Sequence, residues 1–447
     1  MPALPGEHPA DSGHSHSDGR PCGTESAPTF ASVGVPPSLV EVLASNGIVT
    51  PFPIQVATLP DGLAGRDILG QGQTGSGKTL GFAIPLVARL TDGFTSAGRP
   101  RGLVLVPTRE LASQVQAVLV PLAAAADLTV TAIFGGIPQN LQVLALRNRA
   151  DIVIACPGRL ADLIEQGHCH LGDVEITVLD EADQMSDYGF LPAVRELLEA
   201  TPPDGQRMLF SATLDRDVDV LVRRFMNHPA RHSAAATEAP LAMVHHLLTV
   251  TPADRTGVVA ALTGGRGRSL VFTRTKQRAH QLARQLTQAG IPAGELHGDL
   301  TQSSRERNLA AFAAGTTRVM VATDIAARGI HVDGVDLVVH ADSPTEHKAY
   351  LHRAGRTARA GATGTVVTLQ TSAQAREVSA MMRKARVAPH AATVTPRSAL
   401  LRSISGDPAP PVQPSARSVP HPAAAPAVPA TGHGAAALSA AFRGSRR

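Results

Sequence analysis

Tryptophan is absent from this chain of 447 residues, and aromatic residues make up only 3% of it. So few rings leave little surface on which nucleobases could stack. The three cysteines, Cys22, Cys156 and Cys169, show no Cys-x-x-Cys spacing. That sparse set argues against a disulfide framework and a zinc site, and it favours a reducing, cytoplasmic location. No apolar run reaches about 18 residues and the N-terminus is polar, so neither a transmembrane helix nor a secretory signal is expected.

The residues that are present indicate a globular chain with two or three domains. Hydrophobic residues make up 43% of the sequence, and the formal net charge is +4. A mildly basic chain is compatible with a polyanionic partner. Residues 1–28 are rich in Gly, Pro, Ser and His, which predicts a disordered leader in which His14 and His16 could bind a metal only weakly.

From residue 29 to residue 230, apolar strands alternate with helical stretches such as Leu111–Leu122 and Leu191–Glu199. Such alternation predicts an α/β domain with a parallel sheet and helices on both faces. The expected strands are Leu103–Val106, Val130–Phe134, Ile152–Ala155, Ile176–Leu179 and Met208–Phe210.

The apolar pattern weakens at residues 231–242, where we place a linker, and a second α/β domain is expected over residues 243–390. Residues 391–447 are rich in Ala and Pro, which predicts a disordered tail. The expected strands of the second domain are Ser269–Thr273, Gly294–Leu296, Arg318–Ala322, Leu337–His340 and Gly364–Leu369.

A glycine-rich segment lies between the apolar run Ile68–Leu69 and a helical stretch that begins at Leu80. This arrangement is typical of a phosphate-binding loop, in which backbone N–H groups and the helix N-terminus surround a polyphosphate. Lys78 is expected to reach the β- and γ-phosphates, and the Thr79 hydroxyl to ligate Mg²⁺. The loop consists of Gly72, Gln73, Thr74, Gly75, Ser76, Gly77, Lys78 and Thr79.

Two adjacent acids, Asp180 and Glu181, follow the apolar run at Val178–Leu179. Carboxyl ends of parallel strands are where open α/β sheets bind ligands. Asp180 could hold Mg²⁺ opposite Thr79, and Glu181 could orient or deprotonate a water molecule. A solvated acidic loop is the alternative, which the upstream phosphate loop disfavours.

Together these motifs resemble the DEAD-box family of ATP-dependent RNA helicases, of bacterial type. Residues 180–183 read Asp-Glu-Ala-Asp, and the resemblance covers about residues 30 to 370. The remaining family motifs occur in order: the Q motif at 47–55, then residues 107–111, 135–136, 211–213, 271–273, 297–299, 302–305, 322–324 and 352–359.

The resemblance implies two RecA-like domains that share one ATP site. Gln55 would pair with adenine and Phe30 would stack on it, while Asp324 would also contact the nucleotide. Arg356 and Arg359, read as one side of a helical turn, would reach the γ-phosphate and make hydrolysis depend on domain closure. Arg353 could be no more than a basic helix face.

Two further groups of residues come from the same resemblance. Residues that couple the nucleotide site to RNA would be Asp183, Ser211, Thr213 and His352. Short donors and arginines suit contacts with phosphate and 2′-OH groups that carry little base information. The RNA path would be lined by Pro107, Thr108, Arg109, Gly136, Gly158, Arg159, Arg305, Thr323 and Gly329.

The chain departs from the family pattern at a few positions. His331 replaces an Asp expected to bind the ribose, a role that Asp333 could take over. Cys156 replaces a Thr that could face RNA, and Gly72 replaces an Ala. Ala358 replaces a Gly, which is harmless if its φ angle is negative.

The sequence therefore predicts a monomeric enzyme that couples RNA-dependent, Mg²⁺-assisted ATP hydrolysis to local unwinding of short RNA duplexes or remodelling of RNA–protein complexes. One alternative is an ATP-gated RNA clamp or scaffold with little unwinding. Another is a DNA helicase. Neither the RNA target nor protein partners follow from the sequence.

Overall fold

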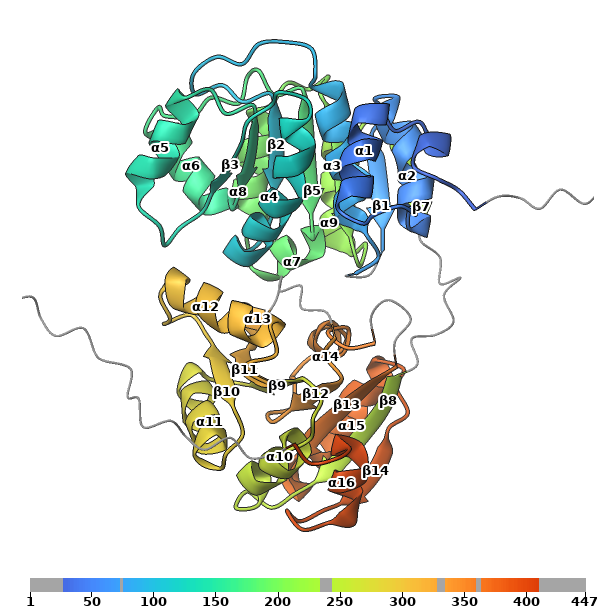
Figure 1. Ribbon diagram of the computed structural model, residues 1–447, viewed down its shortest axis with the longest axis vertical. Coiled ribbons are helices and arrows are strands. Elements are labelled where there is room, and N and C mark those ends of the chain that lie inside the picture. Colours follow the sequence, from blue (N-terminus) through green and yellow to red (C-terminus); the bar gives the residue numbers. More distant parts are fainter. Residues whose placement is uncertain (1–26, 73–74, 234–242, 328–333, 359–362, 410–447) are drawn as a thin grey trace, which may run out of the picture.

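The computed structural model describes residues 27–72, 75–233, 243–327, 334–358 and 363–409. These residues form two α/β domains, one after the other along the chain, each built on a seven-stranded parallel sheet (Figure 1). The predicted fold class is confirmed. No helix within these described ranges is long and apolar enough to cross a membrane.

Domain 1 has the strand order β3-β4-β2-β5-β6-β1-β7. Side chains alternate between the two faces of each strand, so that Ile68 packs in one core and Leu69 in the other. Both faces are covered, which explains the continuous apolar runs. The strands are β1 (Ile68–Gln71), β2 (Gly102–Leu105), β3 (Val130–Ile133), β4 (Ile152–Ala155), β5 (Ile176–Asp180), β6 (Gln206–Ser211) and β7 (Ala230–Ser233).

The helices of domain 1 divide between the two cores. One core receives η1 (Ala31–Val33), α1 (Pro37–Ser45), α2 (Pro53–Leu63), α3 (Lys78–Arg89) and α4 (Arg109–Ala124). The other receives α5 (Gln139–Arg147), α6 (Pro157–Glu165), α7 (Ala182–Asp187), α8 (Leu191–Glu199) and α9 (Arg216–Phe225).

Domain 2 has the strand order β10-β11-β9-β12-β13-β8-β14. Its strands are β8 (Met243–Thr249), β9 (Ser269–Thr273), β10 (Ala293–Leu296), β11 (Val319–Thr323), β12 (Leu337–His340), β13 (Gly364–Gln370) and β14 (His390–Thr393). One face packs against α10 (Arg255–Thr263), α11 (Lys276–Gln288) and α16 (Ala399–Ser405). The other packs against α12 (Gln302–Ala313), α13 (Asp324–Ala327), α14 (His347–Ala354) and α15 (Ala375–Lys384), which the short turn η2 (Ser372–Gln374) precedes.

Two predicted boundaries are wrong. The linker was expected to begin at Arg231, but residues 231–233 belong to β7, which pairs with β1. The disordered tail was expected from residue 391, but β14 pairs with β8 and α16 packs on α10. Val394 and Leu401 are buried there, so the fold of domain 2 extends through these residues.

Candidate functional site

The glycine-rich turn connects β1 to α3, as its sequence context predicted. Lys78 opens α3 and is buried; its Nζ donates to the Gly72 carbonyl at 2.7 Å and lies 3.2 Å from Glu181 Oε1. Gly75 and Gly77 have φ angles of 91° and 85°, a left-handed backbone that suits glycine. Ser76 and Thr79 are half-buried beside them, whereas Gln73 and Thr74 lie outside the described residues.

Gln55 is packed directly against this turn. Its Oε1 accepts a hydrogen bond from Phe52 N at 2.9 Å, and its Nε2 donates to the Gly77 carbonyl at 2.8 Å. A Cβ atom at Gly77 would lie 2.5 Å from Gln55 Nε2. Each end of the amide keeps one further hydrogen-bonding position, so the predicted contact with adenine stays compatible with this geometry.

Phe30 packs in the apolar core of domain 1. Its side chain is 2% exposed and lies with residues such as Val35 and Leu39. Stacking on adenine would require the ring to leave this core in part, and it stays a prediction. Phe52 is instead the exposed aromatic side chain that lies against Gly77.

The two acids stand at the carboxyl end of β5, as expected. Asp180 is fully buried, and burial together with the charge of Glu181 raises its pKa to about 7, although Lys78 acts in the opposite direction. Glu181 has φ 54° and ψ 51°. A left-handed conformation at a residue other than glycine costs about 1–3 kcal/mol and persists mainly at functional sites.

Asp183 is held by the segment after β6. Ser211 Oγ accepts from the Asp183 backbone N–H at 3.2 Å, and Thr213 donates to Asp183 Oδ2 from its N–H at 2.8 Å and its hydroxyl at 2.9 Å. The predicted hydrogen bonds between these two segments are confirmed. Gly72 N also donates to the Ser211 carbonyl at 3.1 Å, which ties the phosphate loop to the same segment.

In domain 2, a small pocket is lined by Asp324, His352, Arg353 and Arg356, together with Phe272, Ala327 and Ala349. Arg356 lies in the turn after α14, which ends at Ala354, so the prediction of a continuous helical turn is wrong. Arg359 lies outside the described residues.

Arg353 is more than a basic helix face. Its buried guanidinium binds both carboxylate oxygens of Asp324, at 2.5 and 2.7 Å, and donates to the Asp342 carbonyl. It also lies 5.1 Å above the centre of the Phe272 ring. In this conformation Asp324 is therefore bound to Arg353, and a nucleotide contact would have to use the same carboxylate.

The RNA candidates of domain 1 lie at helix starts and turns. Thr108 caps α4 by accepting from Leu111 N at 3.2 Å, next to the buried Pro107. Arg109 lies so close to Gly136, whose φ is 88°, that a Cβ there would meet Arg109 Nη1 at 2.1 Å.

Two more of these candidates open α6. Gly158 is exposed with nothing within 4 Å of an added Cβ. Arg159 lies 3.7 Å from Asp162, and its buried Nη1 has no hydrogen-bond partner among the described residues. Gly158 is thus exposed and Arg159 half-buried, and contact of either residue with RNA stays a prediction.

Arg305 makes a contact between the domains. Its Nε donates to Glu110 Oε1 of domain 1 at 2.7 Å, and its Nη1 donates to the His297 carbonyl at 3.2 Å. Both side chains of the ion pair are more than nine-tenths buried. Arg305 is thus engaged in this conformation, while Thr323 is buried at the end of β11 and Gly329 lies outside the described residues.

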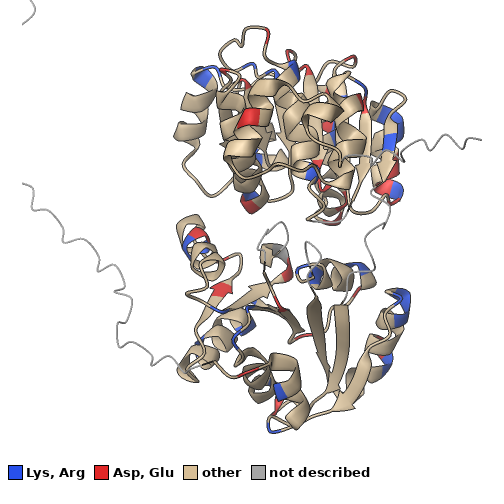
Figure 2. Ribbon diagram, turned by 45° about the vertical axis from the view of Figure 1, so that its right-hand side comes forward, with Lys and Arg blue, Asp and Glu red and all other residues tan. Residues whose placement is uncertain are grey.

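A second ion pair joins the domains: Lys348 Nζ lies 2.9 Å from Asp215 Oδ2. Burial opposes the charge of Asp215, yet the hydrogen bond from Lys348 lowers its pKa, and the same bond raises the pKa of Lys348. Figure 1 places α7 of domain 1 and α12–α14 of domain 2 at the facing ends, and Figure 2 shows charges of both signs there. Sequence reasoning missed Glu110, Asp215 and Lys348, because their partners are more than 130 residues away.

The departures from the family pattern can be followed at two positions. Ala358 has φ 55°, so the condition under which the replacement of glycine is harmless does not hold. Burial and the charge of Glu110 raise the pKa of the Cys156 thiol to about 12, which keeps it protonated. His331 and Asp333 lie outside the described residues.

Comparisons with known proteins match both domains in order. The models for "DEAD/DEAH box helicase" and "Helicase conserved C-terminal domain" match residues 52–221 and 255–361. The Arabidopsis thaliana protein "DEAD-box ATP-dependent RNA helicase 20" is 37% identical over 355 residues, 78% of this chain and 71% of the relative. The Zea mays protein "DEAD-box ATP-dependent RNA helicase 3A, chloroplastic" is 41% identical over 372 residues, 81% of this chain.

This chain spans about half the length of that Zea mays relative, 50%. Among solved structures, "S. cerevisiae Dbp5 bound to RNA and ADP BeF3" is similar with a TM-score of 0.73 and 27% identity, over 85% of this chain and 100% of that one. Because the phosphate loop, the Asp-Glu-Ala-Asp segment and both domains agree with these matches, the chain belongs to the DEAD-box family of ATP-dependent RNA helicases.

Proposed function

We propose that the chain binds ATP with Mg²⁺ at the phosphate loop and hydrolyses it in an RNA-dependent way, separating short RNA duplexes locally or remodelling RNA–protein complexes. The observation that carries the proposal is the convergence of Lys78, Asp180 and Glu181 at the carboxyl edge of the domain 1 sheet. The yeast Dbp5 structure, with RNA and ADP BeF3 bound, supports the same ligands here.

The residues of the loop fit these ligands. Gly75 and Gly77 hold left-handed conformations that turn backbone N–H groups toward one point, and the N-terminus of α3 adds a favourable dipole. Asp180 is a buried carboxylate that a divalent cation would stabilise in its charged form, with Thr79 as the second candidate ligand. Mg²⁺, when bound, would neutralise charge that develops on the phosphates.

Lys78 has to change partners for this chemistry. In the described conformation its ammonium group is held by Glu181 and by the Gly72 carbonyl. Moving Lys78 onto phosphate oxygens would break this ion pair. The Glu181 carboxylate, which also accepts from Gln184 Nε2 at 3.1 Å, could then accept a proton from the attacking water molecule. The buried ion pair therefore keeps the general base occupied until the substrate is in place.

Domain 2 would supply the remaining positive charge. Arg356 follows α14, a helix that Figure 1 shows at the end of domain 2 that faces domain 1. An arginine that reaches the γ-phosphate only when the domains close would accelerate hydrolysis by about 10³–10⁵. RNA held by both domains would favour that closure, which accounts for RNA dependence without base-specific contacts.

The test is steady-state ATP hydrolysis with and without a pool of single- and double-stranded RNA. We expect strong RNA stimulation in the wild type and a loss of at least about 100-fold in Glu181→Gln, because the amide cannot accept the proton. Hydrolysis that is indifferent to RNA would contradict the coupling. Release of a labelled strand from a short duplex, measured in parallel, separates unwinding from clamping, and DNA in place of RNA tests the DNA-helicase alternative.

A further inference from the structure

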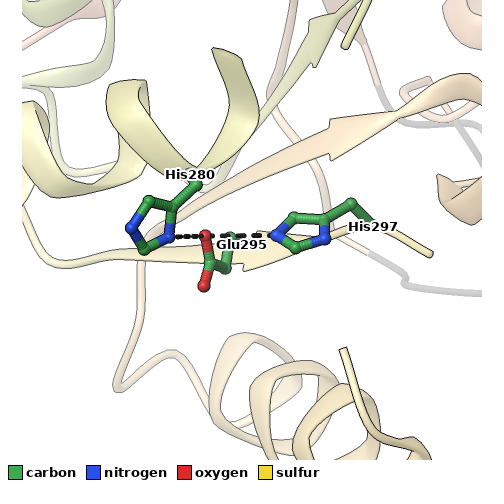
Figure 3. Close-up of side chains that lie close together, drawn as sticks. All are labelled: His280, Glu295 and His297. Carbon is green, nitrogen blue, oxygen red and sulfur yellow. Dashed lines mark hydrogen bonds and ion pairs between the residues drawn. The ribbon is translucent and has the colours of Figure 1, made fainter. Parts of the chain in front are cut away.

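Three potential metal ligands meet on domain 2 at a place that the nucleotide and RNA candidates do not use. His280 comes from α11, Glu295 from the edge strand β10, and His297 from the residue after that strand (Figure 3). One ligand atom from each lies within 4.8 Å of the other two. Among the residues that the structure describes, this is the one such group of three His, Cys, Asp or Glu.

Two of the three separations are close to those around a small tetrahedral ion, and the third is within 4.8 Å. Glu295 Oε2 lies 2.8 Å from His280 Nδ1 and 3.4 Å from His297 Nε2. Ligands bound to zinc at about 2.0–2.1 Å in tetrahedral geometry are about 3.3 Å apart. The His297 distance already has this value, and the exposed His280 side chain can move outward by the few tenths of an ångström that the other distance needs.

The environment of His297 indicates that these three side chains lack a binding partner. The residue is 6% exposed, and neither ring nitrogen has a hydrogen-bond partner among the described residues; Glu295 Oε2 lies 3.4 Å from Nε2 without making a hydrogen bond. A buried polar atom without a partner costs about 1–3 kcal/mol. In Figure 3, Nε2 of His297 points toward Glu295, so a cation between them would satisfy the ring and balance the carboxylate.

We propose that His280, Glu295 and His297 bind one divalent transition-metal ion of the zinc class. Two imidazoles and one carboxylate suit Zn²⁺ or Co²⁺ better than Mg²⁺ or Ca²⁺, which take oxygen ligands. Three protein ligands leave the fourth position to water. Because the site is formed within domain 2, the proposal does not depend on the proposed ATPase activity.

The backbone of the same segment links the site to α12. Asn308 Nδ2 donates to the Glu295 carbonyl at 2.9 Å, and Arg305 Nη1 donates to the His297 carbonyl at 3.2 Å. A metal ion would therefore fix the segment from which α12 and its contact with Glu110 are positioned. We expect the bound ion to stabilise this part of domain 2 against unfolding.

The experiment uses the full chain with His8→Ala, His14→Ala and His16→Ala, so that histidines of the leader do not bind the added metal. Zn²⁺ binding is measured by calorimetry, and Co²⁺ binding by the visible absorption of a tetrahedral complex. In this background we expect one equivalent of metal to bind. His280→Ala should weaken its affinity by more than about tenfold, since loss of a residue that only supports a metal ligand already weakens metal binding by that much. Glu295→Gln, which keeps the side-chain size, should show the same loss.

His170→Ala, an exposed histidine in domain 1, is the matched control and should bind metal like the background. Zn²⁺ should raise the melting temperature of the background and of His170→Ala, but not that of His280→Ala. Because His280 is exposed, its substitution leaves the metal-free fold intact, which the melting curve without metal verifies. Equal stoichiometry and affinity in the background and in His280→Ala would overturn the proposal.

Discussion

At Ala358 the backbone conformation favours glycine, whereas burial of the methyl group favours alanine. Its φ angle of 55° is costly for any residue with a Cβ, by about 1–2 kcal/mol, yet its methyl group is buried at 2% exposure. Replacing it by glycine would remove the strain, but would also lose about 0.8 kcal/mol of burial and add freedom to the unfolded chain.

We therefore expect Ala358→Gly to change the free energy of unfolding by less than about 1 kcal/mol, because these contributions offset one another. Ala358→Val should destabilise by more than about 2 kcal/mol, since a β-branched side chain adds overpacking to the strained backbone. Denaturant unfolding of both variants measures the difference. If Ala358→Val is as stable as Ala358→Gly, residue 358 does not adopt the left-handed conformation.

The raised pKa of Asp180 predicts that the free energy of unfolding depends on pH. Burial raises its pKa to about 7 in the folded state, whereas the carboxyl ionises near 3.8 when unfolded. Between these values the folded state binds a proton that the unfolded state does not. Stability from this group is therefore full below about pH 4 and is lost as the pH rises through about 7, at about 1.4 kcal/mol per unit.

The measurement is the free energy of unfolding of metal-free protein across this pH range, compared with Asp180→Asn. The wild type should lose stability relative to the variant as the pH rises, because asparagine does not titrate. Parallel curves for the two proteins would show that Asp180 is ionised throughout, and that the charge of Lys78 outweighs burial.

At the scale of elements, most strands that sequence reasoning located are buried, although the half-buried edge strands β3 and β10 were located as well. Ser269–Thr273 and Leu337–His340 were predicted with their observed bounds, because fully covered parallel strands read as short apolar runs. The internal strand β8 was missed, and so were the edge strands β7 and β14. Their sequences, Ala-Arg-His-Ser and His-Ala-Ala-Thr, carry few large apolar side chains, and only pairing with β1 and β8 defines them.

The ATP-site motifs were predictable for a related reason: the phosphate loop and the acidic pair are contiguous in sequence and follow strands. The contacts of Arg353 and Arg305 were not, since each depends on a side chain brought near by the fold. The burial of Phe30 in the core of domain 1 was not predictable either, because its position in the motif says nothing about packing.

The C-terminal element gives a prediction of its own. Leu401 of α16 is 1% exposed and packs in the domain 2 core, so Leu401→Ala should destabilise by about 2–5 kcal/mol. Arg402→Ala, at the neighbouring exposed position, should stay within about 0.5 kcal/mol. Thermal unfolding of the two variants is the measurement. Equal melting temperatures would restore the prediction of a disordered tail from residue 391.

At the scale of the whole molecule, the buried pair of Glu110 and Arg305 joins the two domains, as does the pair of Lys348 and Asp215. Glu110→Gln should loosen that contact and free Arg305 for a polyanion. The cost is smaller than the 3–5 kcal/mol typical of a broken buried pair, because the domains can part and let water reach both groups.

Fluorescence energy transfer between a dye on domain 1 and a dye on domain 2 should fall in Glu110→Gln. The affinity for RNA, measured without nucleotide, should rise. The exchanged variant Glu110→Arg with Arg305→Glu should recover the transfer, but not the RNA affinity. Glu175→Gln, which removes a partner of Arg101 within domain 1, is the control and should leave the transfer unchanged. Unchanged transfer in Glu110→Gln would show that the pair does not hold the domains.

The two sheets have the same strand order: reducing each strand number of domain 2 by seven gives the order of domain 1. By this equivalence β8 takes the place of β1, and the turn after it, where Thr251 Oγ1 donates to Asp254 Oδ2 at 2.8 Å, takes the place of the phosphate loop. That turn has an acid and no glycine, so it would repel a polyphosphate. The chain is in effect a dimer of like modules fused into one polypeptide. Under the proposed function, one copy would bind the nucleotide, and Arg356 of the other would act on it as a residue of a neighbouring subunit would in an oligomer.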